Sequence, residues 1–144
     1  MHLSAVLKLK VLVLVTTHLL LIACSGHKTI SRDELRSQLT SAASIAAEAE
    51  TFIDYIREDR APRSYAEGHI TFLVVEVDRS SKELEKAAPE VGIEPQFLEC
   101  REQLHYLGQA LRTVRPLASP DELPSVKERI TLIRKALEEA KSTL

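Results

Sequence analysis

The sequence has no tryptophan and few of the residues that form turns. Its 144 residues include 4 Gly and 6 Pro, and only 4% are aromatic. So few Gly and Pro argue against a turn-rich β-sandwich, and so few aromatics weaken the case for a protein that stacks on nucleic-acid bases. Two cysteines are too few for a disulfide-rich scaffold. A net charge of −2 gives no electrostatic reason to expect a polyanion, so we expect no nucleic-acid partner.

The N-terminal segment has the pattern of a signal peptide. Lys8 and Lys10 supply positive charge, and an apolar run interrupted by His18 follows over residues 11–22. At about a dozen residues, the run is shorter than the ~20 that a membrane-spanning helix needs and suits the apolar region of a signal peptide. The run ends in Leu21-Ile22-Ala23-Cys24.

Leu21-Ile22-Ala23-Cys24 resembles the lipobox of bacterial lipoproteins. In that family, the Cys sulfur receives a diacylglyceryl group and the chain is then cut just before it. The resemblance implies that residues 1–23 are removed and that acyl chains on Cys24 anchor the protein to a membrane. Ser25 is similar to the sorting residue of outer-membrane lipoproteins in diderm bacteria, which implies the periplasmic face of that membrane. An ordinary signal peptide, or an N-terminal anchor with a chance Cys, is the alternative.

The implied mature protein is more acidic than the whole chain. Starting at Cys24, it has 121 residues, with 17 Lys and Arg against 21 Asp and Glu, a net charge of −4. An acidic domain gains nothing from anionic lipid, so the acyl chains must supply the anchoring. We expect residues 24–30 to be a short tether, reaching at most ~3.5 Å per residue, and residues 31–144 to form one helical domain.

The first predicted helix starts at a capping box, in which the Ser31 and Glu34 side chains bond each other's backbone N–H. Apolar residues then alternate at spacings of four and three, which predicts a helix ending near Arg60, before Pro62. Its seam is Leu35, Leu39, Ala42, Ala46, Ala49, Ile53 and Ile56. The small residues in the middle of this seam would let a neighbouring helix approach closely.

Three more segments repeat this spacing. The second is predicted to begin at Pro62, the third to follow the Pro89, Gly92 and Pro95 connection, and the fourth to begin at a second capping box around Ser119 or to slip to about Leu123. Residues 70–77 are rich in β-branched side chains and could form a strand, but the rest of the chain offers that strand no partner, which favours a helix. The seams are Ala66, Ile70, Leu73, Val77, Ser80, Leu84 and Ala87; Phe97, Cys100, Leu104, Leu107, Leu111 and Val114; and Val126, Ile130, Ile133, Leu137, Ala140 and Leu144.

Four helical segments with short connections predict an all-α fold, an antiparallel up-down bundle of four helices. A three-helix core with a short fourth helix is the alternative.

Few residues point to metal chemistry. Glu102 and His105 have the Glu-x-x-His spacing of di-iron bundles, but a second such motif is missing around His69. An exposed helical pair explains the spacing better, so Glu102, His105 and His69 are only weak metal candidates. Glu76 or Glu99 could assist them in a zinc or copper site. Neither a haem attachment motif nor any other cofactor motif is present, and we expect no cofactor.

The sequence also gives no catalytic motif. Cys100 lies on a helix seam and is expected to be a small buried hydrophobe, although an intermolecular disulfide or redox thiol is an alternative. His105, five residues further on, faces elsewhere and cannot act as its base. There is no Gly-x-Ser-x-Gly elbow and no Gly-rich phosphate loop. We therefore expect a protein without enzymatic activity.

The remaining expectation is a contact surface. Phe72, Val74 and Val75 widen the apolar face of the second helix, while Ala43 and Ala47 add small residues to the first. These five residues are the predicted interaction surface of a lipid-anchored envelope module with a possible envelope protein partner. A small-molecule or lipid carrier with a cavity beside the Ala-rich seam, and a metal-binding bundle, are the alternatives.

Overall fold

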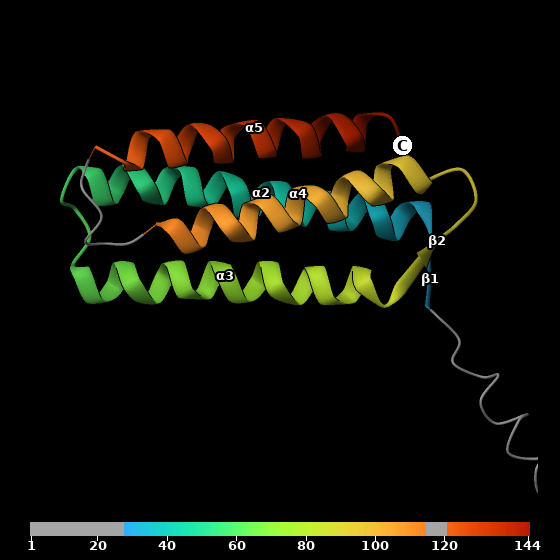
Figure 1. Ribbon diagram of the computed structural model, residues 1–144, viewed down its shortest axis with the longest axis horizontal. Helices are drawn as coiled ribbons and strands as arrows, with labels where there is room; N and C mark the ends of the chain where they lie inside the picture. Colours follow the sequence, from blue (N-terminus) through green and yellow to red (C-terminus); the bar gives the residue numbers. More distant parts are fainter. Residues whose placement is uncertain (1–27, 115–120) are drawn as a thin grey trace, which may run out of the picture.

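The computed structural model describes residues 28–114 and 121–144, which form four helices and two short strands. Successive helices run in opposite directions, and all four lie side by side (Figure 1). This confirms the predicted antiparallel four-helix bundle. The last helix is as long as the one before it, so the three-helix alternative is wrong. The elements are β1 (Lys28–Ile30), α2 (Arg32–Arg57), α3 (Arg63–Glu85), β2 (Ala87–Pro89), α4 (Glu94–Thr113) and α5 (Leu123–Ser142).

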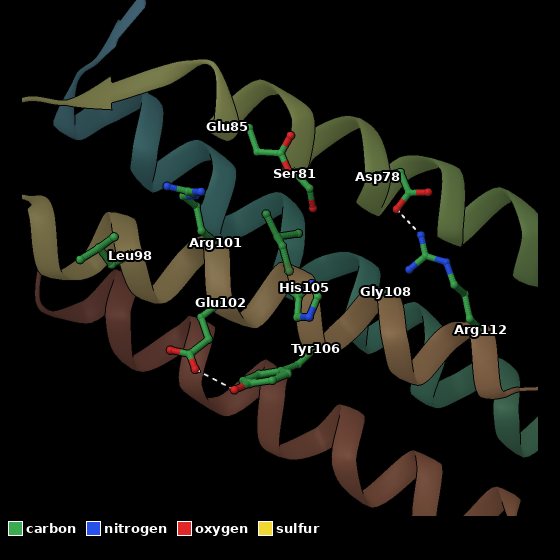
Figure 2. A pocket seen from close by; sticks show the side chains of 11 residues that line it. Asp78, Ser81, Glu85, Leu98, Arg101, Glu102, His105, Tyr106, Gly108 and Arg112 are labelled. Carbon is green, nitrogen blue, oxygen red and sulfur yellow. Dashed lines mark hydrogen bonds and ion pairs between the residues drawn. The ribbon is translucent and has the colours of Figure 1, made fainter.

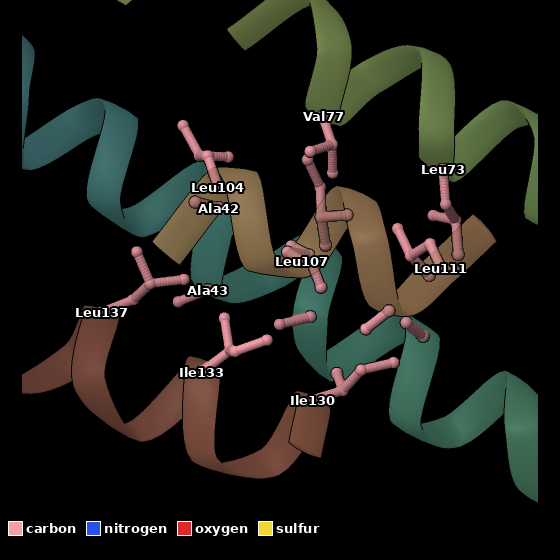
Figure 3. Close-up of a cluster of buried hydrophobic side chains, with 14 of the residues drawn as sticks. Ala42, Ala43, Leu73, Val77, Leu104, Leu107, Leu111, Ile130, Ile133 and Leu137 are labelled. Carbon is pink, nitrogen blue, oxygen red and sulfur yellow. The ribbon is translucent and has the colours of Figure 1, made fainter. Parts of the chain in front are cut away.

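The predicted seams form one core. Every seam residue of the four helices is buried except Ile56, Ala87 and Leu144, which pack against the core at its edge. The contact between α2 and α5 is the most extensive in the bundle. The small side chain of Ala43 lies beside Leu137 of α5, and that of Ala42 lies beside Leu104 of α4 (Figure 3). Short side chains on α2 therefore let α5 pack closely, as the Ala-rich seam predicts.

Local signals set both ends of α2. The predicted capping box is present: Ser31 Oγ accepts from the Glu34 N–H at 3.3 Å, and the Ser31 N–H donates to Glu34 Oε2 at 2.9 Å. The helix ends at Arg57, a turn earlier than expected, because Asp59 takes a left-handed conformation with φ of 53°. The Arg60 N–H then donates to the Tyr55 carbonyl, closing a Schellman turn.

The other helix starts refine the expectations. Residues 70–77 lie within α3, so the strand alternative is wrong, and Pro62 precedes α3 as its cap residue instead of opening it. Helix α5 begins at Leu123, the later of the two expected starts, and Glu122 caps it without a side-chain hydrogen bond. Ser119 of the expected second capping box lies outside the described residues.

The two strands were not expected from the sequence. Strand β1 pairs in parallel with β2, in the register Lys28 with Ala87 and Ile30 with Pro89. The Ile30 side chain is buried, and its carbonyl accepts from the Glu90 N–H at 3.0 Å. The last three residues of the expected tether are therefore part of the folded domain, because Ile30 adds apolar surface to the core.

Candidate functional site

A polar groove of about 670 Å³ lies between α3 and α4 (Figure 2). Helix α3 contacts α4 about as extensively as α5 does, but it contacts α2 much less than α5 does. Acidic, basic and hydroxyl side chains face one another across this space. The lining residues are Asp78, Ser81, Glu85, Leu98, Arg101, Glu102, Leu104, His105, Tyr106, Gly108 and Arg112.

Two pairs of polar side chains in the groove bond to each other. Arg112 bridges to Asp78 across the groove, and the Tyr106 hydroxyl donates to Glu102 at 2.7 Å (Figure 2). That Glu102 carboxylate raises the pKa of the Tyr106 phenol, because ionising the phenol would break the bond and oppose two negative charges. His105 Nε2 lies 2.9 Å from the amide nitrogen of Gln109 on its own helix. The walls are charged, so the groove differs from the apolar cavity that an acyl chain would need.

Gly108 lies against the arginine of the cross-groove bridge. A Cβ at this position would lie 2.9 Å from Nη1 of Arg112 and 3.4 Å from a methyl group of Val77. Because the glycine has no side chain, the guanidinium lies over the α4 backbone and reaches Asp78. A side chain at this position would therefore require the Arg112 guanidinium to move.

The weak metal candidates are not brought together. His69 lies between α2 and α3, where its Nε2 is 3.1 Å from Glu48 Oε1 and its ring centre is 4.2 Å from that of Phe52. His105 and Glu102 instead line the groove between α3 and α4. Glu76 pairs with Arg79 and Glu99 accepts from Gln103, so neither joins a histidine. In residues 28–114 and 121–144, no three His, Cys, Asp or Glu side chains form a group that could hold a metal ion.

Cys100 is part of the core. Its side chain has no exposed surface, and burial raises the pKa of its thiol to about 12. The thiolate is the reactive form, so the folded protein presents an inert thiol at this position. The sequence-based expectation of a small buried hydrophobe is confirmed.

The predicted interaction surface is only partly a surface. Phe72 and Val75 are more than half exposed, whereas Val74 is half-buried against the core. Ala43 was wrongly placed on the surface: it is buried because α5 packs directly over it. Ala47 is exposed, but it lies on α2 and not on α3 with Phe72 and Val75.

Tyr65 belongs with the exposed apolar residues of α3, and the sequence reasoning missed it. It is 58% exposed, against 52% for Phe72 and 56% for Val75. Spacings of seven and three residues place all three on one side of the helix. We call Tyr65, Phe72 and Val75 the α3 patch. The seven-residue spacing from Tyr65 to Phe72 indicates that Tyr65 shares this face, but the continuous apolar run that starts at Ile70 is a stronger signal and does not include Tyr65.

Two hollows border the α3 patch. An apolar one of about 340 Å³ lies between α3 and the end of α4, with Val75 and Leu111 among its walls. A second, of about 430 Å³, follows the outer face of α3 from Val75 to Lys86 and carries both signs of charge. Both hollows reach the patch at Val75, and neither is lined by Tyr65 or Phe72.

Comparison with known proteins identifies no relative. No protein-family model matches this chain, and neither curated proteins nor solved structures give a match. Within the described part of the chain, no helix has the length and apolar character to cross a membrane. Cys24 and the expected lipobox, residues 21–24, lie outside the described residues.

Proposed function

We propose that this protein is a lipid-anchored helical bundle of the bacterial cell envelope that acts by binding another protein, without catalysis of its own. The observation that carries the interaction role is the α3 patch. Its three large apolar side chains are each more than half exposed on one helix face. Large apolar side chains that are exposed together on one face are typical of contact sites.

The lipobox resemblance supports the anchoring. Acylation of Cys24 would hold the domain at the periplasmic face of the outer membrane through a short N-terminal segment. Because the implied mature chain is acidic, the acyl chains would supply the membrane affinity and leave the sides of the bundle available to a partner. Proteins confined to one membrane surface meet at a raised effective concentration, so a patch of this modest size would suffice.

The anchor is tested by metabolic labelling of the full-length chain with a palmitate analogue. We expect label on the wild type and on Cys100→Ala, and none on Cys24→Ala. Cys100→Ala is the matched control because it removes the chain's other cysteine. Label that persists on Cys24→Ala, or that is missing from the wild type, would overturn the lipoprotein assignment.

The interaction role is tested with a photo-crosslinking amino acid in cells. Position 72, on the α3 patch, is compared with position 132 on α5, where Leu132 is 60% exposed. We expect a discrete cross-linked species from position 72 and none from position 132. Equal cross-linking at both positions, or none at position 72, would refute the assignment of α3 as the contact face.

A further inference from the structure

We infer that the polar groove between α3 and α4 is a binding site for a short peptide that carries a free ammonium group and a free carboxylate. No residue of the α3 patch lines this groove, so the site does not depend on the proposed contact surface. Spacings of three and four residues place two rows of side chains along the groove, one from each helix. The rows are Asp78, Ser81 and Glu85 on α3, and Leu98, Arg101, His105, Gly108 and Arg112 on α4.

The two rows face each other in an antiparallel register. A Cβ on Gly108 would lie 3.4 Å from a methyl group of Val77, which places these two positions at the same level of the bundle. Because the helices are antiparallel, Glu85, further along α3, lies level with the part of α4 that precedes Gly108 and contains Arg101. Glu85 and Arg101 therefore lie on opposite walls of the same stretch of the groove (Figure 2).

An ion pair spans the groove at one end only. There, Arg112 bridges to Asp78. Towards the other end, the side chains of Glu85 and Arg101 form neither an ion pair nor a hydrogen bond within the part of the chain that the structure describes. The Arg101 guanidinium carbon lies 5.8 Å from the centre of the Phe97 ring. An unpaired anion and an unpaired cation therefore line the same open space.

The charges of the lining residues select the class of ligand. With His105 counted as neutral, three carboxylates and two guanidinium groups line the groove, a net charge of −1. A phosphate or other polyanion would meet this negative charge, and a ligand that is only cationic would leave Arg101 unpaired. Because the two unpaired groups have opposite signs, a ligand with one ammonium and one carboxylate pairs with both of them.

The size of the groove favours a peptide over a single amino acid. Its volume of about 670 Å³ lies in the range of sites that hold drug-sized ligands, and one amino acid would fill only part of it. Leu98 and the Ser81 hydroxyl line the groove with the unpaired groups and offer an apolar contact and a hydrogen bond to the peptide. Arg101 would bind the carboxylate with its planar guanidinium, and Glu85 the ammonium.

NMR titration of the full-length chain in detergent micelles tests the site. The probes are tri-alanine, its N-acetylated form, its C-terminal amide and free alanine. We expect tri-alanine to bind, and each blocked form to bind about five-fold more weakly, because each loses one of the two charge pairs. Alanine that binds as tightly as tri-alanine would overturn the assignment to a peptide.

Matched variants locate the binding. Arg101→Gln should weaken tri-alanine about five-fold and leave the affinity of the amide unchanged, whereas Glu85→Gln should weaken tri-alanine and leave that of the N-acetylated form unchanged. Lys82→Gln and Glu83→Gln remove the same charges from α3 outside the groove and should have no effect. The inference is overturned if tri-alanine does not bind at millimolar concentration, if all three peptide forms bind equally, or if the control variants weaken binding equally. Photo-crosslinking at position 72 reports on the α3 patch independently of these results.

Discussion

Individual ion pairs tie α2 to α5 at the edge of the core. Arg134 Nε donates to Glu50 at 2.7 Å, with the two side chains 26% and 15% exposed, and Lys127 donates to Asp54 one turn further along α2. The Glu50 carboxylate raises the pKa of the Arg134 guanidinium, and Lys127 lowers the pKa of Asp54. Pairs in this partly buried setting are screened less than the exposed pair of Arg36 and Asp33.

The Asp54 pair predicts a pH dependence of stability. The hydrogen bond from Lys127 holds the pKa of Asp54 below its ordinary value of 3.8, although burial opposes this. A carboxylate with a lowered folded-state pKa stabilises the fold above its unfolded pKa and loses that contribution as the pH falls through the folded value. Asp54→Asn should therefore reduce the free energy of unfolding at pH 7, and this difference from wild type should shrink below pH 3.8. Urea unfolding of both proteins at several pH values measures this difference in the free energy of unfolding.

The matched control is Glu67→Gln, whose side chain is 51% exposed in its pair with Arg63 and lies outside the first turn of α3. It should change stability little at any pH. A double-mutant cycle of Asp54→Asn with Lys127→Met should give a coupling of about 0.5–1 kcal/mol. A coupling near zero, or a difference for Asp54→Asn that stays constant down to pH 2, would contradict the assignment.

At the scale of elements, the two helical glycines predict different responses to alanine. Gly68 has open space around its missing Cβ and helical geometry, so Gly68→Ala should stabilise α3 by about 0.5–1 kcal/mol. At Gly108, an added Cβ would lie 2.9 Å from Nη1 of Arg112 and 3.4 Å from a methyl group of Val77, so these side chains must move, which offsets part of the gain in helix propensity. Thermal unfolding of the two variants at low protein concentration measures the difference, and equal stabilisation would show that the Gly108 packing is unimportant.

Helix periodicity is the part of the fold that the sequence predicts best. The seams of α2 and α5 repeat over five or more turns, so a single misplaced residue cannot shift the buried face. Periodicity predicts which face of its helix a residue lies on, but not which other helix packs against that face. Ala43 lies beside the seam and is buried only because α5 packs over it, which a pattern on α2 alone cannot predict.

Short parallel strands leave almost no trace in a sequence. β1 and β2 have three residues each, too few for an alternating pattern, and β2 ends in Pro89. Their pairing depends on the bundle bringing the start of α2 beside the end of α3. The sequence likewise predicts only part of the candidate site. Phe72 and Val75 lie in an evident apolar run, and the sequence predicts their exposure. The α3–α4 groove depends on how two helices are spaced, which the pattern of a single helix does not predict.

At the scale of the whole molecule, the first and last segments of the domain lie at the same end of the bundle. Strand β1 and the C-terminus lie at this end (Figure 1). The Arg32 side chain donates to the Leu144 carbonyl, and the Gln96 amide donates to the Thr143 hydroxyl at 3.2 Å. The domain therefore begins at the end of the bundle where hydrogen bonds hold its last residues, and β1 packs against the core there.

If β1 is a structural element and not a free tether, its buried side chain must stabilise the fold. Ile30 is 4% exposed, and removing most of a buried aliphatic side chain typically costs about 2–4 kcal/mol. Ile30→Ala should therefore lower the free energy of unfolding by roughly that amount, while the exposed Thr29→Ala should change it by less than about 0.5 kcal/mol. Chemical denaturation of both variants measures the difference. An Ile30→Ala protein as stable as Thr29→Ala would mean that the bundle folds without β1 and that residues 24–30 are all tether. The expected loss would instead leave only residues 24–27 between the folded domain and the proposed acyl anchor.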